Sequence, residues 1–196
     1  MFYTMKQLAC DPNSLKGLSE KLIVSHYENN YAGAVKRLHA ITMQLAELEW
    51  NSAPIFILNG LKREELIAYN SMLLHEVYFE SLGSSAASAQ LEQQLTVDFG
   101  SVNNWMTQFA AMGKAQGGGS GWVLLTWCQR ECKLINTWAA DHTNNLAGAT
   151  PILALDMYEH SYHIDYGAAA AKYVEAFMHN LNLAAASAKL ATLIGV

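Results

Sequence analysis

Cysteine, proline and charged residues are all scarce in this sequence. The three cysteines, Cys10, Cys128 and Cys132, form an odd set with no CxxC pair, which argues against a disulfide framework and against a thiolate zinc site. Charged residues make up 15% of the 196 residues and hydrophobic residues 52%. That composition excludes a disordered chain, and it predicts an oligomer in which a partner covers apolar surface.

The sequence also lacks the features of nucleic-acid-binding and membrane proteins. Its net charge is −5 with no cluster of Lys and Arg, so a basic surface for nucleic acid is not expected. Apolar runs such as residues 151–155 fall far short of the roughly 20 residues that span a bilayer. The start, MFYTMKQLAC, shows no charged region followed by an apolar one, so no secretory signal is expected and the predicted location is the cytoplasm.

Helical periodicity dominates the first half of the chain. Residues 15–50 place apolar side chains three and four positions apart, which predicts a long helix with Ser19 near its start. A second helical pattern covers residues 61–82. The segments Asn51–Pro54 and Asn59–Gly60 between them are typical of turns. We therefore expect an antiparallel pair of helices.

The second half alternates helical patterns with short strand-like runs. Helices are expected over residues 86–95, 101–116 and 158–194, and strands rich in Trp, Val, Leu and Ile over 121–128, 133–138 and 150–155. The sequence thus predicts an α+β fold in two parts. An N-terminal antiparallel helical hairpin (residues 1–84) precedes a mixed lobe (residues 85–196) that combines helices with a small three-stranded antiparallel sheet.

Residues able to bind a metal follow the last predicted strand. Asp156 leaves this apolar strand, where an unpaired carboxylate is costly unless a cation meets it. His160 lies one helical turn further on, so both side chains could converge on one metal ion. Asp156 could equally be a helix N-cap and His160 a packed core histidine.

Two further histidines occupy apolar faces of the predicted hairpin helices. His26 lies on the first helix and His75 on the second, where ligands of a metal held inside a helix bundle are placed. Either could be an ordinary core residue. Together with Asp156 and His160 they would give three neutral imidazoles and one carboxylate, a set of net charge −1 that suits a divalent first-row metal and leaves a position for solvent or substrate.

Taken together, these motifs resemble the iron/manganese superoxide dismutase family over nearly the whole chain. The matching segments are Ser25-His26-Tyr27, residues 74–79 (LHEVYF), residues 119–124 (GSGWVL), residues 156–162 (DMYEHSY) and residues 173–177 (YVEAF). The resemblance implies that one Fe or Mn ion per subunit is bound by His26, His75, Asp156 and His160. It also implies that superoxide, or another small oxidant, is the substrate, converted by one-electron cycling of the metal to dioxygen and hydrogen peroxide.

The resemblance implies roles for residues around the metal as well. His142 falls where the family has a Gln or His, which makes it the candidate proton donor to metal-bound solvent; the alternative is a plain loop histidine. Tyr27, next to His26, is the other candidate catalytic residue. Glu159 would cross the interface of a homodimer, or of a higher homo-oligomer, to bond the partner subunit's His160, or it could simply favour a helix N-terminus. The remaining candidates near the metal and the interface are Asn30, Trp122, Tyr158 and His163.

Departures from the family pattern cluster at the substrate entrance. Ala34 stands at the gateway Tyr, Leu124 at a second Trp, and residues 167–171 lack the funnel Arg. Loss of a guiding cation slows association with an anion by roughly ten to a thousandfold. Three alternatives therefore remain open: a superoxide dismutase that is slow, a non-dismutating metalloprotein or oxidoreductase on the same scaffold with an opened pocket, and an interaction protein with core histidines and no metal.

Overall fold

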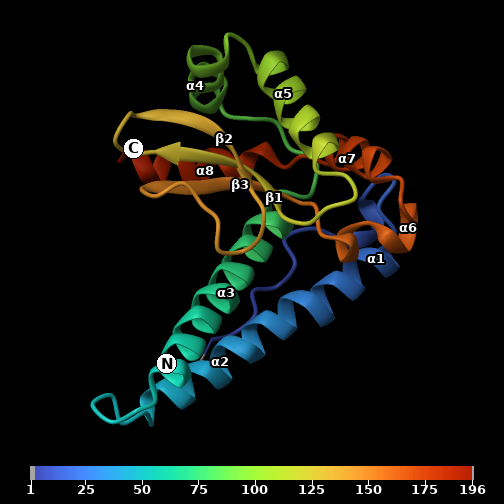
Figure 1. Ribbon diagram of the computed structural model, residues 1–196. Coiled ribbons are helices and arrows are strands. Elements are labelled where there is room, and N and C mark those ends of the chain that lie inside the picture. Colours follow the sequence, from blue (N-terminus) through green and yellow to red (C-terminus); the bar gives the residue numbers. More distant parts are fainter. Residues whose placement is uncertain (1–2, 196) are drawn as a thin grey trace.

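The computed structural model describes residues 3–195 as a helical hairpin joined to a lobe of helices and one sheet (Figure 1). Helices α2 (Ala32–Ala46) and α3 (Ile55–Glu80) form the hairpin, and the C-terminal end of α3 reaches the sheet. The α+β class and the antiparallel hairpin are confirmed. The turn expected at Asn59–Gly60 was wrong, because Pro54 starts α3 earlier, at a position where its fixed φ suits a helix start.

The first long helix contains a wider turn at its centre. After a short 3₁₀ turn, η1 (Pro12–Ser14), the chain runs through α1 (Glu20–Ser25) and a π-helical segment, η2 (His26–Tyr31), into α2. The predicted helix start near Ser19 is confirmed, and the Ser19 hydroxyl caps it by accepting the Leu22 N–H at 3.1 Å. The predicted bounds of residues 15 and 50 were too wide. π-Helical turns are rare in proteins, and those that occur often lie at functional sites. This one begins at His26.

The sheet has three antiparallel strands with β1 (Trp122–Cys128) between β2 (Lys133–Ala139) and β3 (Ala149–Asp156). All three predicted strands are confirmed, with small shifts at their ends. Strand β1 is buried along its whole length. Pro151 is tolerated because β3 is an edge strand, and a register shift lies beside it. The register brings Trp122 opposite Asp156.

Six further helical segments surround this sheet. They are α4 (Ala89–Phe99), α5 (Val102–Ala115), η3 (Glu159–Ser161), α6 (His163–Tyr166), α7 (Ala170–His179) and α8 (Leu183–Ile194). The helical character expected over residues 158–194 is confirmed, but it is divided among η3, α6, α7 and α8. The chain turns at Gly167, with φ of +52°, and again near Asn180, whose side-chain amide donates to the Lys16 carbonyl at 2.7 Å and so joins this turn to the N-terminal segment.

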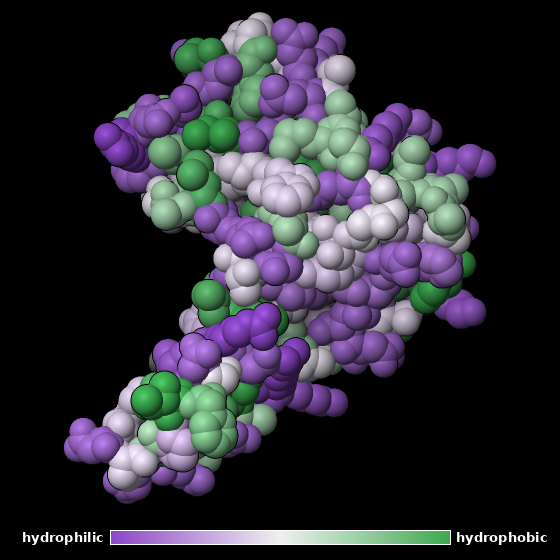
Figure 2. All heavy atoms as spheres, in the orientation of Figure 1, coloured by the Kyte–Doolittle hydropathy of each residue, from purple (hydrophilic) through white to green (hydrophobic). Residues whose placement is uncertain are grey.

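A single hydrophobic core joins the hairpin to the sheet, through buried side chains such as Leu38, Met72 and Leu124. The predicted division at residues 84 and 85 stays a prediction. Apolar side chains gather at the tip of the hairpin (Figure 2), where Ile55 is 87% and Phe56 75% exposed. Among the described residues, no helix has the length and apolar character needed to cross a membrane.

Gly121 directly precedes β1, the strand whose first residue pairs with Asp156 of β3. We expect the replacement of Gly121 by alanine to be strongly destabilising. Its φ is +123°, and an added Cβ would lie 2.0 Å from the Ala139 carbonyl oxygen. Backbone would have to move at the start of β1. Gly121→Ala should lower the free energy of unfolding by about 3 kcal/mol, measured by urea denaturation. Gly118→Ala, at φ +80° with open space around it, is the control and should cost about 1 kcal/mol.

Candidate metal centre

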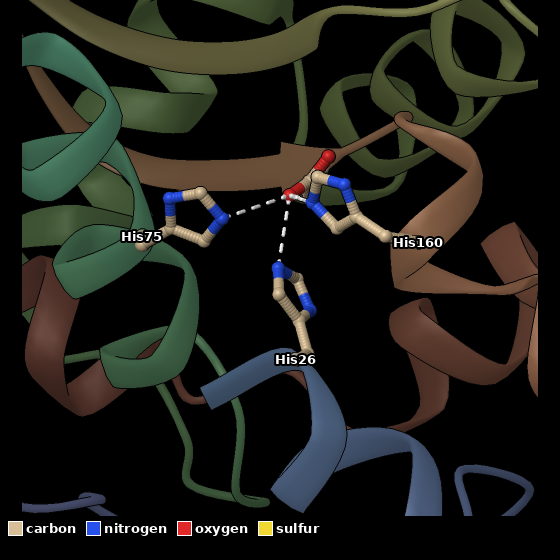
Figure 3. Close-up of side chains that lie close together, drawn as sticks. His26, His75 and His160 are labelled. Carbon is tan, nitrogen blue, oxygen red and sulfur yellow. Dashed lines mark hydrogen bonds and ion pairs between the residues drawn. The ribbon is translucent and has the colours of Figure 1, made fainter. Parts of the chain in front are cut away.

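Four predicted ligands meet at the junction of the hairpin and the sheet (Figure 3). His26 lies at the start of η2, His75 on α3, Asp156 at the end of β3 and His160 in η3. One potential ligand atom from each residue lies within 4.8 Å of the other three. The Nε2 atoms of His26, His75 and His160 lie 3.2, 3.7 and 3.1 Å from the same oxygen, Asp156 Oδ2. Elements far apart in sequence thus converge on one point.

The buried nitrogen atoms at this point are short of hydrogen-bond partners. His26, His75 and Asp156 are almost fully buried, and His160 is partly exposed. Among residues 3–195, neither ring nitrogen of His26 has a hydrogen-bond partner, and the same holds for His75 Nε2. Buried polar atoms without partners are rare and costly. A cation between these nitrogens and the carboxylate would satisfy them, and three nitrogens with one oxygen form a donor set suited to iron or manganese.

Hydrogen bonds within the chain fix the direction of two ligands. His75 Nδ1 donates to the Ser71 carbonyl at 2.6 Å, so the lone pair of the neutral ring lies on Nε2, which faces the other ligands. Asp156 Oδ1 accepts the Tyr158 N–H at 2.9 Å, which leaves Oδ2 for the centre. The carbonyl of Asp156 accepts hydrogen bonds from Tyr173 and Ser161, both at 2.8 Å. The ligands are therefore held in place by their surroundings.

The environment also sets the protonation of the ligands. Burial lowers the pKa of His75 to about 3 and lowers the pKa of His26 as well. Burial alone would raise the pKa of Asp156, but the neighbouring His160 and His26 outweigh it and hold the pKa below its ordinary value. Near neutral pH, the site therefore offers deprotonated imidazoles and an ionised carboxylate, the forms that bind metals.

His142 lies beside this centre, in the loop after β2. Trp122 Nε1 donates to His142 Nδ1 at 3.1 Å, so a neutral His142 carries its proton on Nε2. The Tyr158 ring stacks on His142 and on His160, with centroid separations of 4.8 and 5.4 Å. The Asn70 side chain holds the backbone by donating to the His142 carbonyl at 2.6 Å. The structure thus places His142, Trp122 and Tyr158 around the four ligands.

Tyr27 lies on the other side of His26. Its hydroxyl donates to the Lys6 carbonyl at 2.7 Å, and its ring contacts Tyr31 and Phe79. The hydroxyl is thus engaged with the N-terminal segment and not with the ligands, and a catalytic role for Tyr27 stays a prediction. These contacts suit a residue that positions the helix carrying His26.

The candidates for a subunit interface occupy the surface. Glu159 and His163 are exposed on η3 and α6, next to Ile164, which is 45% exposed. Asn30 lies on the π-helical segment and lines a pocket together with Ala34 and His142. The structure describes one chain, so the expected contacts of Glu159, His163 and Asn30 with a second subunit stay predictions.

Comparison with known proteins agrees with this arrangement. The family model described as "Iron/manganese superoxide dismutases, C-terminal domain" matches residues 87–189. A superoxide dismutase [Fe] of Cupriavidus metallidurans is 62% identical over 195 residues, which cover 99% of each chain. The chain belongs to the iron/manganese superoxide dismutase family. Further relatives are a superoxide dismutase [Fe] of Aquifex pyrophilus, 30% identical over 87% of this chain and 83% of the relative, and a superoxide dismutase [Mn] 1 of Halobacterium salinarum, 30% identical over 89% and 88%.

The sequence did not predict a role for two residues near the metal centre of this superoxide dismutase family member, Ser71 and Tyr31. Ser71 supplies the carbonyl that orients His75, and its position four residues before His75 on one helix was the available signal. Tyr31 is buried with its ring 6.4 Å from that of His75, and its hydroxyl donates to Glu76 at 3.0 Å. Nothing in the sequence pattern distinguished Tyr31 from an ordinary core residue.

Proposed function

We propose that the protein is a superoxide dismutase that binds one iron or manganese ion per subunit through His26, His75, Asp156 and His160. The observation that carries the proposal is the convergence of three histidine nitrogens, two of them buried, on one carboxylate oxygen. An ion held there supplies one-electron exchange. One superoxide loses an electron and becomes dioxygen, and a second gains an electron and two protons and becomes hydrogen peroxide.

The residues of the chain supply orientation and a proton. Ser71 and Tyr158 hold His75 and Asp156 in their ligating directions through backbone groups. His142 is the proposed proton donor, since Trp122 occupies its Nδ1 and leaves the proton on Nε2. The alternative of a non-dismutating metalloprotein is not favoured, because a superoxide dismutase [Fe] shares 62% of its residues with this chain over nearly full length.

The test compares metal-loaded and metal-free protein in a superoxide-consumption assay. Protein loaded with about one equivalent of iron or manganese should consume superoxide much faster than the same concentration of free metal, and protein stripped with a chelator should not. A loaded protein with no rate above the free-metal control would contradict the proposal.

Replacement of His142 should separate metal binding from catalysis. His142→Ala keeps all four ligands, so the metal content should stay near that of the wild type. The rate should fall by about 10- to 100-fold, because a residue that tunes the site from outside the ligand set is lost. The pH dependence of the rate should also change. His179→Ala, which removes an exposed histidine at the end of α7, is the control; equal rates for both variants would remove His142 from the mechanism.

We also propose a homodimer, or a higher homo-oligomer, located in the cytoplasm. The exposed Glu159 and His163 support an interface at η3 and α6, where Glu159 would bond the partner subunit's His160. Cys10, Cys128 and Cys132 are all unpaired, which supports a reducing compartment. Light scattering should give a mass of at least two chains, and a monomer at micromolar concentration would contradict the interface.

A further inference from the structure

A pocket of about 290 Å³ opens beside the proposed metal centre. It lies between helices α2 and α3 and the loop after β2, and small side chains on both helices leave it open. Its lining includes Asn30, Ala34, Arg37, Ala68, Ser71 and His142. No large side chain stands at position 34 to close it. The pocket is therefore wide enough for a diatomic anion and its water molecules.

The inner part of this pocket adjoins the ligands. Ser71 is within it, and the Ser71 carbonyl accepts the hydrogen bond that orients His75. His142 is also within it, with its ring centroid 6.1 Å from that of His75. A small molecule in the pocket thus meets residues that contact the metal centre directly. The pocket has the position expected of a substrate entrance.

Positive charge lines this entrance on a chain that is negative as a whole. The net charge is −5, which on average repels a superoxide anion. At the pocket, the Arg37 guanidinium pairs with Glu64, but Glu64 also meets Arg63, with Nη1 and Oε1 3.6 Å apart. Among the described residues that line the pocket, Arg37 is the one side chain of the Asp, Glu, Lys and Arg types, since Glu64 and Arg63 do not line it. Such local fields raise association rates of anions.

Arg37 lines the same pocket as His142, the residue at its inner part. Arg37 is more than half exposed, lies on α2 and is not one of the four predicted ligands. It can therefore act on an approaching anion without taking part in metal binding.

We propose that Arg37 is the cation that guides superoxide into the pocket between α2 and α3. It is a substrate-guiding residue for the reaction proposed above, and the inference rests on that reaction for the identity of the anion. Residues 167–171 contain no Arg. The Arg37 guanidinium supplies the attraction for the anion that this segment lacks.

The test measures the second-order rate with superoxide as a function of ionic strength, on iron-loaded protein. Arg37→Gln should lower this rate about threefold at 10 mM salt and Arg37→Glu about tenfold, and both should approach the wild type at 500 mM salt, where charges are screened. Glu64→Gln should have the opposite effect and raise the rate at low salt, because it removes the carboxylate that partly neutralises Arg37. Arg130→Gln makes the same change of charge in the turn between β1 and β2 and should leave the rate unchanged.

A second readout does not depend on activity. Azide, a small anion that binds ferric iron, is titrated into the iron-loaded protein and followed by visible absorption. Arg37→Gln should weaken azide binding about threefold at low salt, with unchanged iron content and melting temperature. If the wild type bound azide in this way but did not consume superoxide, the proposed function would fail while Arg37 kept its role toward anions. Equal salt dependence of the rate in the wild type and Arg37→Gln, or equal azide affinities, overturns the proposal.

Discussion

Asp156→Ala is expected to abolish stable binding of iron and manganese. Asp156 Oδ2 is the atom on which the three histidine Nε2 atoms converge, between 3.1 and 3.7 Å away. It is also the one negative charge in the set. Without it, a divalent ion would have to enter a buried site with only neutral imidazoles to offset its lost hydration. Metal content measured by mass spectrometry should fall from about one equivalent to under a tenth.

Thermal unfolding gives an independent measure of the same effect. Metal that binds only the folded protein at 100 times its dissociation constant adds about 2.7 kcal/mol to the free energy of unfolding. Added metal should therefore raise the melting temperature of the wild type and leave that of Asp156→Ala unchanged. Glu175→Ala, which removes an exposed carboxylate on α7, should behave as the wild type. Retention of metal by Asp156→Ala would contradict the ligand assignment.

The ligands could be predicted because each lies in a local pattern that sequence displays. Asp156 follows an apolar strand, His160 is one helical turn beyond it, and His26 and His75 interrupt apolar helical faces. These local patterns left core histidines as an alternative to ligands. The packing of α3 against β3 and the convergence of the three Nε2 atoms on Asp156 Oδ2 favour the ligands, and neither is visible in the sequence.

Elements that depend on tertiary contacts were harder to predict. The π-helical turn at residues 26–31 has no sequence signature of its own, and the breaks in the C-terminal segment depend on Asn180 bonding the distant Lys16. The role inferred for Arg37 follows from the pairing of α2 with α3, which brings Arg37 and Glu64 together from the two helices of the hairpin. The alanine-rich sequence indicated helix after residue 158 but did not show where it divides into the four segments observed.

The metal-free protein is expected to lose stability as the pH falls below 6.5. Burial lowers the pKa of His75 from 6.5 to about 3 and lowers that of His26 in the same direction. Between these values the unfolded chain binds protons that the folded chain does not, so the free energy of unfolding rises with pH and falls on acidification. Each such imidazole costs about 1.4 kcal/mol per pH unit, or about 2 kcal/mol between pH 6.5 and 5.

Urea unfolding of chelator-treated protein at pH 7, 6 and 5 measures this loss. His75→Gln should remove about half of the pH dependence, because one of the two buried imidazoles is gone, whereas His179→Gln at an exposed position should retain all of it. A pH-independent free energy of unfolding would mean that the imidazoles are not held neutral by burial. Bound metal keeps the imidazoles deprotonated, so the loaded protein should remain stable to a lower pH and then lose metal and structure together.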